Sequence, residues 1–194
     1  MMSDRASLII LAGGDSRRMG RPKHLLPTSR GTILEHLAQR LSPLFGEILL
    51  VGRDPAGIPD EMRFVEDLRP ERSPLVGVYS GLQAAENDVC FVTGCDMPFI
   101  VPQLVQLLLE QADGVDVVVP LIGGFYEPLF SIYHRTCAAT IERALDNGWL
   151  KVTSIYPELR IREIAEAAVR AIDPDLASFI NLNTPKQLSL LARL

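Results

Sequence analysis

A glycine-containing basic stretch near the N-terminus has the residue types needed to bind a polyphosphate. Gly13 and Gly14 directly follow an apolar run, and they are followed by several cations: Arg17, Arg18, Arg21 and Lys23. Glycine lacks a Cβ, so it allows positive φ and lets a ligand approach the backbone closely. Backbone N–H groups can then surround phosphate oxygens while the cations offset their charge. The stretch predicts a phosphate-binding loop; the alternative is a strand–loop connection with a solvated basic patch.

The spacing of this loop differs from the two commonest phosphate-binding motifs. Counted from Gly13, the second and third glycine positions of the dinucleotide fingerprint hold Asp15 and Arg18. A Walker A loop needs Gly-Lys-Ser/Thr, whereas Lys23 is followed by His24. If the loop binds phosphate, it is therefore a loop of another type.

Asp96, a carboxylate after a predicted strand, is a candidate metal ligand. It follows the apolar run 89–93 and precedes Pro98 by two positions. A single carboxylate beside a phosphate loop suits Mg²⁺, which usually takes one or two carboxylates together with substrate phosphates. The alternative role is a helix cap or a turn former. We predict that Asp96 is the magnesium ligand.

The other reactive residue types form no recognisable constellation. Ser16, Ser80 and Thr93 have no histidine and acid at the spacing of a nucleophilic triad. The three cysteines and three histidines contain no Cys-x-x-Cys pair. A zinc site or a disulfide framework is therefore not expected, and the cysteines fit a reducing compartment.

The elements that must position these residues alternate between strands and helices. Apolar and β-branched runs predict strands over residues 7–11, 47–51, 63–66, 89–93, 115–119, 129–133 and 160–164, the last at a sheet edge. Capping residues and helical periodicity predict helices over 33–44, 76–85, 102–109 and 136–145, with another from Pro185. The alternation favours an open, mostly parallel α/β sheet. Ligands bind such sheets at the carboxyl ends of the strands, where the basic loop and Asp96 are both expected.

Composition and charge limit the class of protein. The chain has 194 residues, of which 47% are hydrophobic, and a formal net charge of −5. These values predict one globular domain over residues 1–194, able to bury about 70% of its unfolded surface. The acidic balance argues against nucleic-acid binding, so the basic loop should bind a small anion. The apolar run 6–12 is too short for a membrane span and has no export-signal pattern, so we expect a cytoplasmic protein.

Three stretches of the chain resemble the molybdopterin nucleotidyltransferases, and most closely the molybdenum cofactor guanylyltransferases among them. They are the loop L-A-G-G-x-S-x-R-M-G-x-x-K over 11–23, Gly-Cys-Asp-Met-Pro-Phe over 94–99, and Asn-Leu-Asn-Thr-Pro over 181–185. They occur in the family's order, so the resemblance covers nearly the whole chain. It implies a Rossmann-like, three-layer α/β domain with a mixed sheet, similar to the nucleotide-diphospho-sugar transferases.

The resemblance also implies roles for individual residues. Nucleotide contact is implied for Leu11, Ala12, Gly13, Lys23, Asp67 and Asp96. A catalytic role is implied for Arg18, Lys23 and Asp96, with Mg²⁺ bound to Asp96. Asn181 and Asn183 are implied to lie on the pterin side of the site. Two alternatives stay open: Asp67 as a solvated loop carboxylate, and the two asparagines as a cap for the turn before Pro185.

The implied reaction is transfer of GMP from GTP to the terminal phosphate of molybdenum-molybdopterin, with release of pyrophosphate. A phosphate monoester has a second pKa of about 6, so this nucleophile is largely ionised at neutral pH and needs no side-chain base. That agrees with the lack of a triad pattern. Proteins that deliver or accept the molybdenum cofactor are the implied partners.

Two positions depart from the guanylyltransferase pattern. Pro22 stands before the lysine where aspartate is usual, and Gly52-Arg53 stands where asparagine is usual. The Gly13-Gly14 pair favours the guanylyl form, because cytidylyl relatives tend to have Ala-Gly there. The alternatives are a cytidylyltransferase or sugar-phosphate nucleotidyltransferase of the same fold, and a nucleotide-binding module without turnover.

Overall fold

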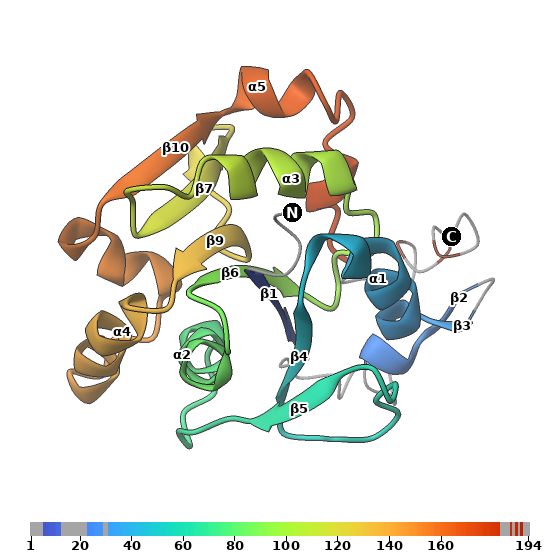
Figure 1. Ribbon diagram of the computed structural model, residues 1–194, viewed down its shortest axis with the longest axis horizontal. Coiled ribbons are helices and arrows are strands. Elements are labelled where there is room, and N and C mark those ends of the chain that lie inside the picture. The colour runs from blue at the N-terminus through green and yellow to red at the C-terminus, as the bar shows by residue number, and fades with distance from the viewer. Residues whose placement is uncertain are drawn as a thin grey trace.

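A mixed β-sheet forms the centre of the computed structural model, which describes residues 6–12, 23–28, 31–182, 187, 189 and 191 (Figure 1). Its strand order is β10-β7-β9-β6-β1-β4-β5, and β8 pairs with β7 outside this path. The strands are β1 (Ala6–Leu11), β4 (Glu47–Gly52), β5 (Arg63–Glu66), β6 (Val89–Gly94), β7 (Val117–Ile122), β8 (Phe125–Tyr126), β9 (Phe130–His134) and β10 (Ile161–Ala165). A separate ribbon pairs β2 (Pro27–Thr28) with β3 (Gly31–Thr32).

Most neighbouring strands of the main sheet run parallel. β1 pairs in parallel with β4 and β6, β4 with β5, and β10 with β7. β9 is antiparallel to both β6 and β7, and β8 is antiparallel to β7. All six residues of β1 are buried, because this strand lies in the middle of the sheet and is covered on both faces. The predicted mostly parallel, mixed sheet is confirmed.

Helices cover both faces of the sheet, which gives three layers (Figure 1). They are α1 (Ile33–Leu41), α2 (Pro74–Ala84), α3 (Pro102–Glu110), α4 (Cys137–Asp146) and α5 (Glu166–Arg170), with 3-10 turns η3 (Lys23–Leu25), η4 (Ser42–Leu44), η5 (Val152–Glu158) and η6 (Ala177–Phe179). One apolar core contains side chains of α1, α3 and α5, and the other contains those of α2 and α4. Strand side chains alternate between these two cores, as the pleat requires.

Local sequence explains where helices α1 and α2 begin. At α1, Thr32 accepts a hydrogen bond from the Glu35 N–H at 3.2 Å, and the Glu35 carboxylate accepts one from the Thr32 N–H at 2.6 Å. This is a capping box. At α2, Ser73 accepts from the Val76 N–H at 3.3 Å, and Pro74 occupies the first turn. Helix α2 therefore begins immediately after the loop that follows β5.

Most predicted elements are present, with shifted boundaries. The strand predicted over 115–119 is β7 at 117–122, and the helix predicted from residue 76 begins at Pro74. β10 lies at a sheet edge as predicted. The short elements β8, η5 and α5 were not predicted. The helix predicted from Pro185 begins outside the described residues.

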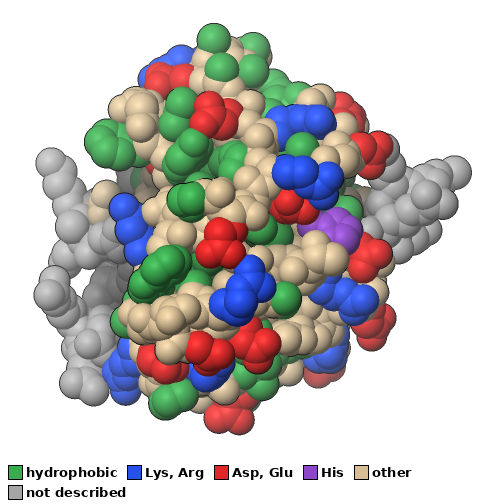
Figure 2. Space-filling view, turned by 90° about the vertical axis from the view of Figure 1, so that its left-hand side faces the viewer, with side chains coloured by type: hydrophobic (Ala, Val, Ile, Leu, Met, Phe, Trp, Pro, Cys, Tyr) green, Lys and Arg blue, Asp and Glu red, His purple; other side chains and the backbone are tan. Residues whose placement is uncertain are grey.

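The described surface carries charges of both signs. On the face shown in Figure 2, lysine and arginine side chains are interspersed with aspartate and glutamate. This mixed distribution fits the small net charge of −5. Within the described ranges, every helix is too short or too polar to cross a bilayer.

Candidate active site

The carboxyl ends of β1, β4 and β6 form one edge of the sheet, and backbone hydrogen bonds continue past the strand ends there. The Ala12 N–H donates to the Val51 carbonyl in β4 at 2.8 Å. The Cys95 N–H donates to the Leu11 carbonyl in β1 at 3.0 Å. Leu11 and Ala12, both predicted to contact nucleotide, therefore lie in a rigid position between their two neighbouring strands.

Asp67 lies at the same edge, one residue past β5. Its N–H donates to the Gly52 carbonyl of β4 at 3.1 Å. Its Oδ2 accepts a hydrogen bond from Nε of Arg53 at 3.0 Å, and the Asp67 side chain is only 14% exposed. The predicted alternative, a solvated loop carboxylate, is therefore wrong for Asp67, because this carboxylate is largely buried and paired with a cation.

Asp96 occupies a tight turn directly after β6. The turn is closed by the Met97 N–H, which donates to the Gly94 carbonyl at 3.3 Å. A Cβ added to Gly94 would lie only 2.6 Å from Oδ1 of Asp96. The half-buried carboxylate of Asp96 thus occupies space that exists because residue 94 is glycine.

The position of Asp96 fits a magnesium ion bound together with phosphate. The carboxylate lies just past the end of a central strand, in the space that Gly94 leaves, and the preceding residue, Cys95, is hydrogen-bonded to the Leu11 carbonyl. Among the described residues, no three side chains of His, Cys, Asp or Glu are grouped as a metal site. One carboxylate with substrate phosphates is a usual donor set for Mg²⁺, so Asp96 suits that ion.

The segment that contains Asn181 lies against the turn of Asp96. The Leu182 N–H donates to the Asp96 carbonyl at 2.8 Å, and the Leu182 side chain is fully buried. The Asn181 side chain donates to the Phe179 carbonyl at 3.4 Å. The structure thus brings the backbone that follows Asn181 against the turn of Asp96, whereas Asn183 lies outside the described residues.

Most of the basic loop lies outside the described residues, including Gly13 and Arg18. The description resumes at Lys23, which begins η3 and whose side chain is not described. The next residue, His24, is buried, and its Nε2 lies 3.1 Å from the Ala56 carbonyl. The backbone at Lys23 is therefore anchored against the segment that follows β4.

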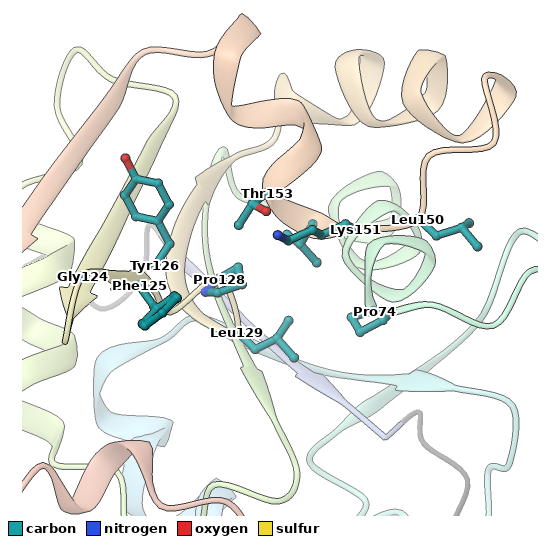
Figure 3. A pocket seen from close by; sticks show the side chains of 10 residues that line it. Pro74, Gly124, Phe125, Tyr126, Pro128, Leu129, Leu150, Lys151 and Thr153 are labelled. Atoms are coloured by element: carbon teal, nitrogen blue, oxygen red, sulfur yellow. The ribbon is translucent and has the colours of Figure 1, made fainter.

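A cavity of about 460 Å³ opens beside the first residue of α2, Pro74 (Figure 3). Phe125 and Leu129 line one side, from β8 and the connection to β9, and Leu150 and Lys151 line the other side before η5. Phe125 is 76% exposed. None of the predicted site residues lines this cavity, and sequence analysis did not identify it.

Glu127 is a further residue at this edge that sequence analysis did not assign. Its N–H donates to the Pro120 carbonyl at 3.0 Å, and its own carbonyl accepts from the Phe130 N–H at 3.0 Å. Phe130 pairs with Thr93 near the end of β6. Burial raises the pKa of the Glu127 carboxyl above its usual range. Its signal in the sequence is an acidic residue that follows Gly123-Gly124, and this pattern favours a structural role.

Relatives of known name match almost the whole chain. A probable molybdenum cofactor guanylyltransferase from Pelotomaculum thermopropionicum is 38% identical over 185 residues, covering 95% of this chain and 90% of the relative. The molybdenum cofactor guanylyltransferase of Desulfosudis oleivorans is 34% identical over 188 residues, covering 95% and 93%.

Solved structures show the same fold. Molybdopterin-guanine dinucleotide biosynthesis protein A from Archaeoglobus fulgidus superposes with a TM-score of 0.82 at 26% identity, covering 96% of this chain and 97% of that one. The 2-C-methyl-D-erythritol 4-phosphate cytidylyltransferase from Thermus thermophilus superposes with a TM-score of 0.73 at 18% identity, covering 97% of this chain and 98% of that one. This second likeness is one of fold alone. Residues 8–160 match the family model of the MobA-like NTP transferase domain. The chain belongs to this nucleotidyltransferase family.

Proposed function

We propose that this chain transfers GMP from GTP to the terminal phosphate of molybdenum-molybdopterin and releases pyrophosphate. The observation that carries the proposal is the placement of Asp96 at the carboxyl edge of the sheet, one residue past Cys95, whose N–H donates to the Leu11 carbonyl. This is the edge at which open α/β sheets bind ligands. The relatives named as guanylyltransferases support the same activity, and we propose that residues 1–194 form one nucleotidyltransferase domain.

The reaction is an in-line displacement at phosphorus. An oxygen of the molybdopterin phosphate forms a bond to the α-phosphorus of GTP, while the bond from that phosphorus to the bridging oxygen of the β-phosphate breaks. The attacking phosphate is already ionised, so the protein positions groups and stabilises charge. Lys23 and Arg18 stabilise charge on the α-phosphate and the departing pyrophosphate. Asp96 would hold Mg²⁺, which when bound neutralises phosphate charge.

The two substrates bind at the same edge of the sheet but contact different elements. The backbone of Leu11, Ala12 and Gly13 and the carboxylate of Asp67 contact the nucleotide. Asn181 and Asn183 lie on the pterin side of the site. The hydrogen bond from the Leu182 N–H to the Asp96 carbonyl supports this arrangement, because it ties the C-terminal segment to the proposed metal ligand.

The choice of base is indicated by the relatives and by two positions of the chain. The names of the relatives favour guanine, whereas Pro22 and Gly52-Arg53 depart from the guanylyl pattern. Arg53 does not point its guanidinium at a nucleotide as the usual asparagine would, because the guanidinium is hydrogen-bonded to Asp67. We therefore retain GTP as the donor and test it against CTP.

Product analysis tests the proposal directly. The protein is incubated with Mg²⁺, molybdenum-molybdopterin and each common nucleoside triphosphate in turn, and product nucleotide and pyrophosphate are identified. Of the nucleoside triphosphates tested, we expect only GTP to give pyrophosphate and a nucleotide-linked product, and that product should contain GMP. A CMP-linked product would identify a cytidylyltransferase, and nucleotide binding without pyrophosphate would identify a non-catalytic module. We propose a cytoplasmic location, with proteins that deliver or accept the cofactor as partners.

A further inference from the structure

The guanidinium of Arg53, in the loop after β4, is enclosed by the turn that follows β5. Its Nε donates to Oδ2 of Asp67 at 3.0 Å. Its Nη2 lies 3.2, 2.9 and 3.0 Å from the carbonyl oxygens of Arg69, Pro70 and Glu71. One side chain thus binds both a carboxylate and three successive backbone carbonyls.

The conformation of this turn depends on a cation at position 53. Three carbonyl dipoles converge on one nitrogen, and without a positive donor there they would repel one another. The turn backbone has another attachment, because the Leu68 N–H donates to Oγ of Ser80 at 2.9 Å. Within the described part of the chain, however, the Asp67 carboxylate has no hydrogen-bond donor other than Arg53. Arg53 is therefore the residue that fixes the direction of this carboxylate.

The contact with Arg53 leaves the other oxygen of Asp67 able to accept a hydrogen bond. Oδ1 has no partner among the described residues, although the side chain is only 14% exposed. An ionised carboxylate only accepts hydrogen bonds, so a ligand at Oδ1 must present a hydroxyl or an N–H group. The positive charge of Arg53 also offsets that of Asp67, which reduces the repulsion of an approaching triphosphate.

We propose that Arg53 is a positioning residue for the guanine nucleotide. By holding Oδ2 of Asp67 and the turn 69–71, it directs Oδ1 toward a hydroxyl or N–H group of bound GTP. This role of Arg53 depends on the proposed function only because it takes GTP as the bound ligand.

Substitutions at Arg53, with a matched control, separate positioning from stability. Arg53→Ala removes both sets of contacts, whereas Arg53→Lys keeps a cation for the carbonyls but cannot also bond Asp67 through a second nitrogen. The control is Arg63→Ala at the start of β5. Arg63 likewise bonds a carboxylate, Glu47 at 2.9 Å, and a carbonyl, Ala84 at 2.7 Å. Its side chain is 47% exposed, against 41% for Arg53.

Binding of GTP with Mg²⁺ is measured by calorimetry, and stability by thermal unfolding. We expect Arg53→Ala to weaken GTP binding about tenfold, the loss of one charge-assisted hydrogen bond, and to lower Tm. Arg53→Lys should recover most of the Tm but little of the affinity. Arg63→Ala should leave the affinity within about twofold of the unmodified protein. If Arg53→Ala leaves the affinity unchanged, or Arg53→Lys restores affinity and Tm together, Arg53 is only structural and the proposal is overturned.

A double-mutant cycle with Asp67→Asn tests whether Arg53 acts through Asp67. In that background, Arg53→Ala should change the affinity less than twofold. An equal loss in both backgrounds would overturn the proposal. If the unmodified protein binds GTP but forms no GMP-linked product, the proposed function fails while the cycle still decides the role of Arg53. If the unmodified protein binds no GTP, both fail.

Discussion

Replacing Gly94 by alanine should impair Asp96 without unfolding the protein. The new Cβ would lie 2.6 Å from Oδ1 of Asp96, whereas carbon and oxygen atoms in close contact stay roughly 3.3 Å apart. The carboxylate must therefore move by about 0.7 Å, the difference between these distances. The backbone of Gly94 lies outside the positive-φ region, so alanine can adopt it.

The size of the effect follows from this displacement. A misplacement of about 1 Å near a reacting centre costs on the order of 10²-fold in rate. For the smaller shift at Asp96 we expect kcat to fall about 10- to 100-fold, equivalent to roughly 1.4–2.7 kcal/mol. Stability should change little, because the displaced atom is the end of a half-buried side chain that can rotate.

Pyrophosphate release at saturating GTP measures this loss, and two further variants make it specific. Gly81→Ala is the stability control, since its Cβ would lie 2.6 Å from Cγ2 of Ile9 in the core. It should lower Tm and leave kcat of the folded fraction nearly unchanged. Gly94→Ala combined with Asp96→Asn should be no slower than Asp96→Asn alone. Unchanged turnover in Gly94→Ala, or losses that multiply in the double variant, would refute the reasoning.

Four other predictions test the site and its surroundings. Asp96→Asn should reduce turnover on the order of 10²–10³-fold, with partial recovery as Mg²⁺ is raised in the assay. Lys23→Ala should raise KM for GTP and lower kcat while Tm, measured by calorimetry, stays unchanged. The unmodified protein should turn over GTP faster than CTP, and equal rates would contradict this. Glu127→Gln should stabilise the protein at neutral pH in denaturant titrations. Burial raises the pKa of Glu127 in the folded state, so its charge destabilises the fold fully above that pKa. The gain from glutamine should therefore shrink as pH falls below the folded-state pKa and be gone below the unfolded-state pKa.

Sequence patterns were sufficient to predict most of the fold, because the local preferences of these segments for helix or strand agree with the positions that they take in the packed structure. The capping box of Thr32 and the buried run of β1 each specify one structure. The shifted boundary of β7 has a long-range cause. The β-branched run ends at Val119 and is followed by Pro120, which cannot donate to a ladder. The strand nevertheless continues to Ile122, because Pro120 and Leu121 pair with β10, and Leu121 and Ile122 pair with β8.

The candidate site was predictable where it consists of strand ends. Asp67 and Asp96 each follow a predicted strand, and parallel strands bring such positions to one edge. The contact of the segment at Asn181 with the turn of Asp96 was not predictable from periodicity, and only the resemblance to a family indicated that this segment belongs to the site. It depends on a backbone hydrogen bond from Leu182 and on the burial of that side chain, neither of which has a local sequence signal.

The role of Arg53 could not be predicted for a related reason. Its partners include backbone carbonyls of a turn that follows the next strand, and residue types do not reveal where carbonyls point. Its contact with Asp67 also bears on which group the carboxylate can bind. The guanidinium offsets the charge of Asp67 and so weakens the attraction of this carboxylate for a cation. Under the proposed function, Asp67 therefore recognises neutral donors of the nucleotide, and the metal is assigned to Asp96, in the space that Gly94 leaves after β6.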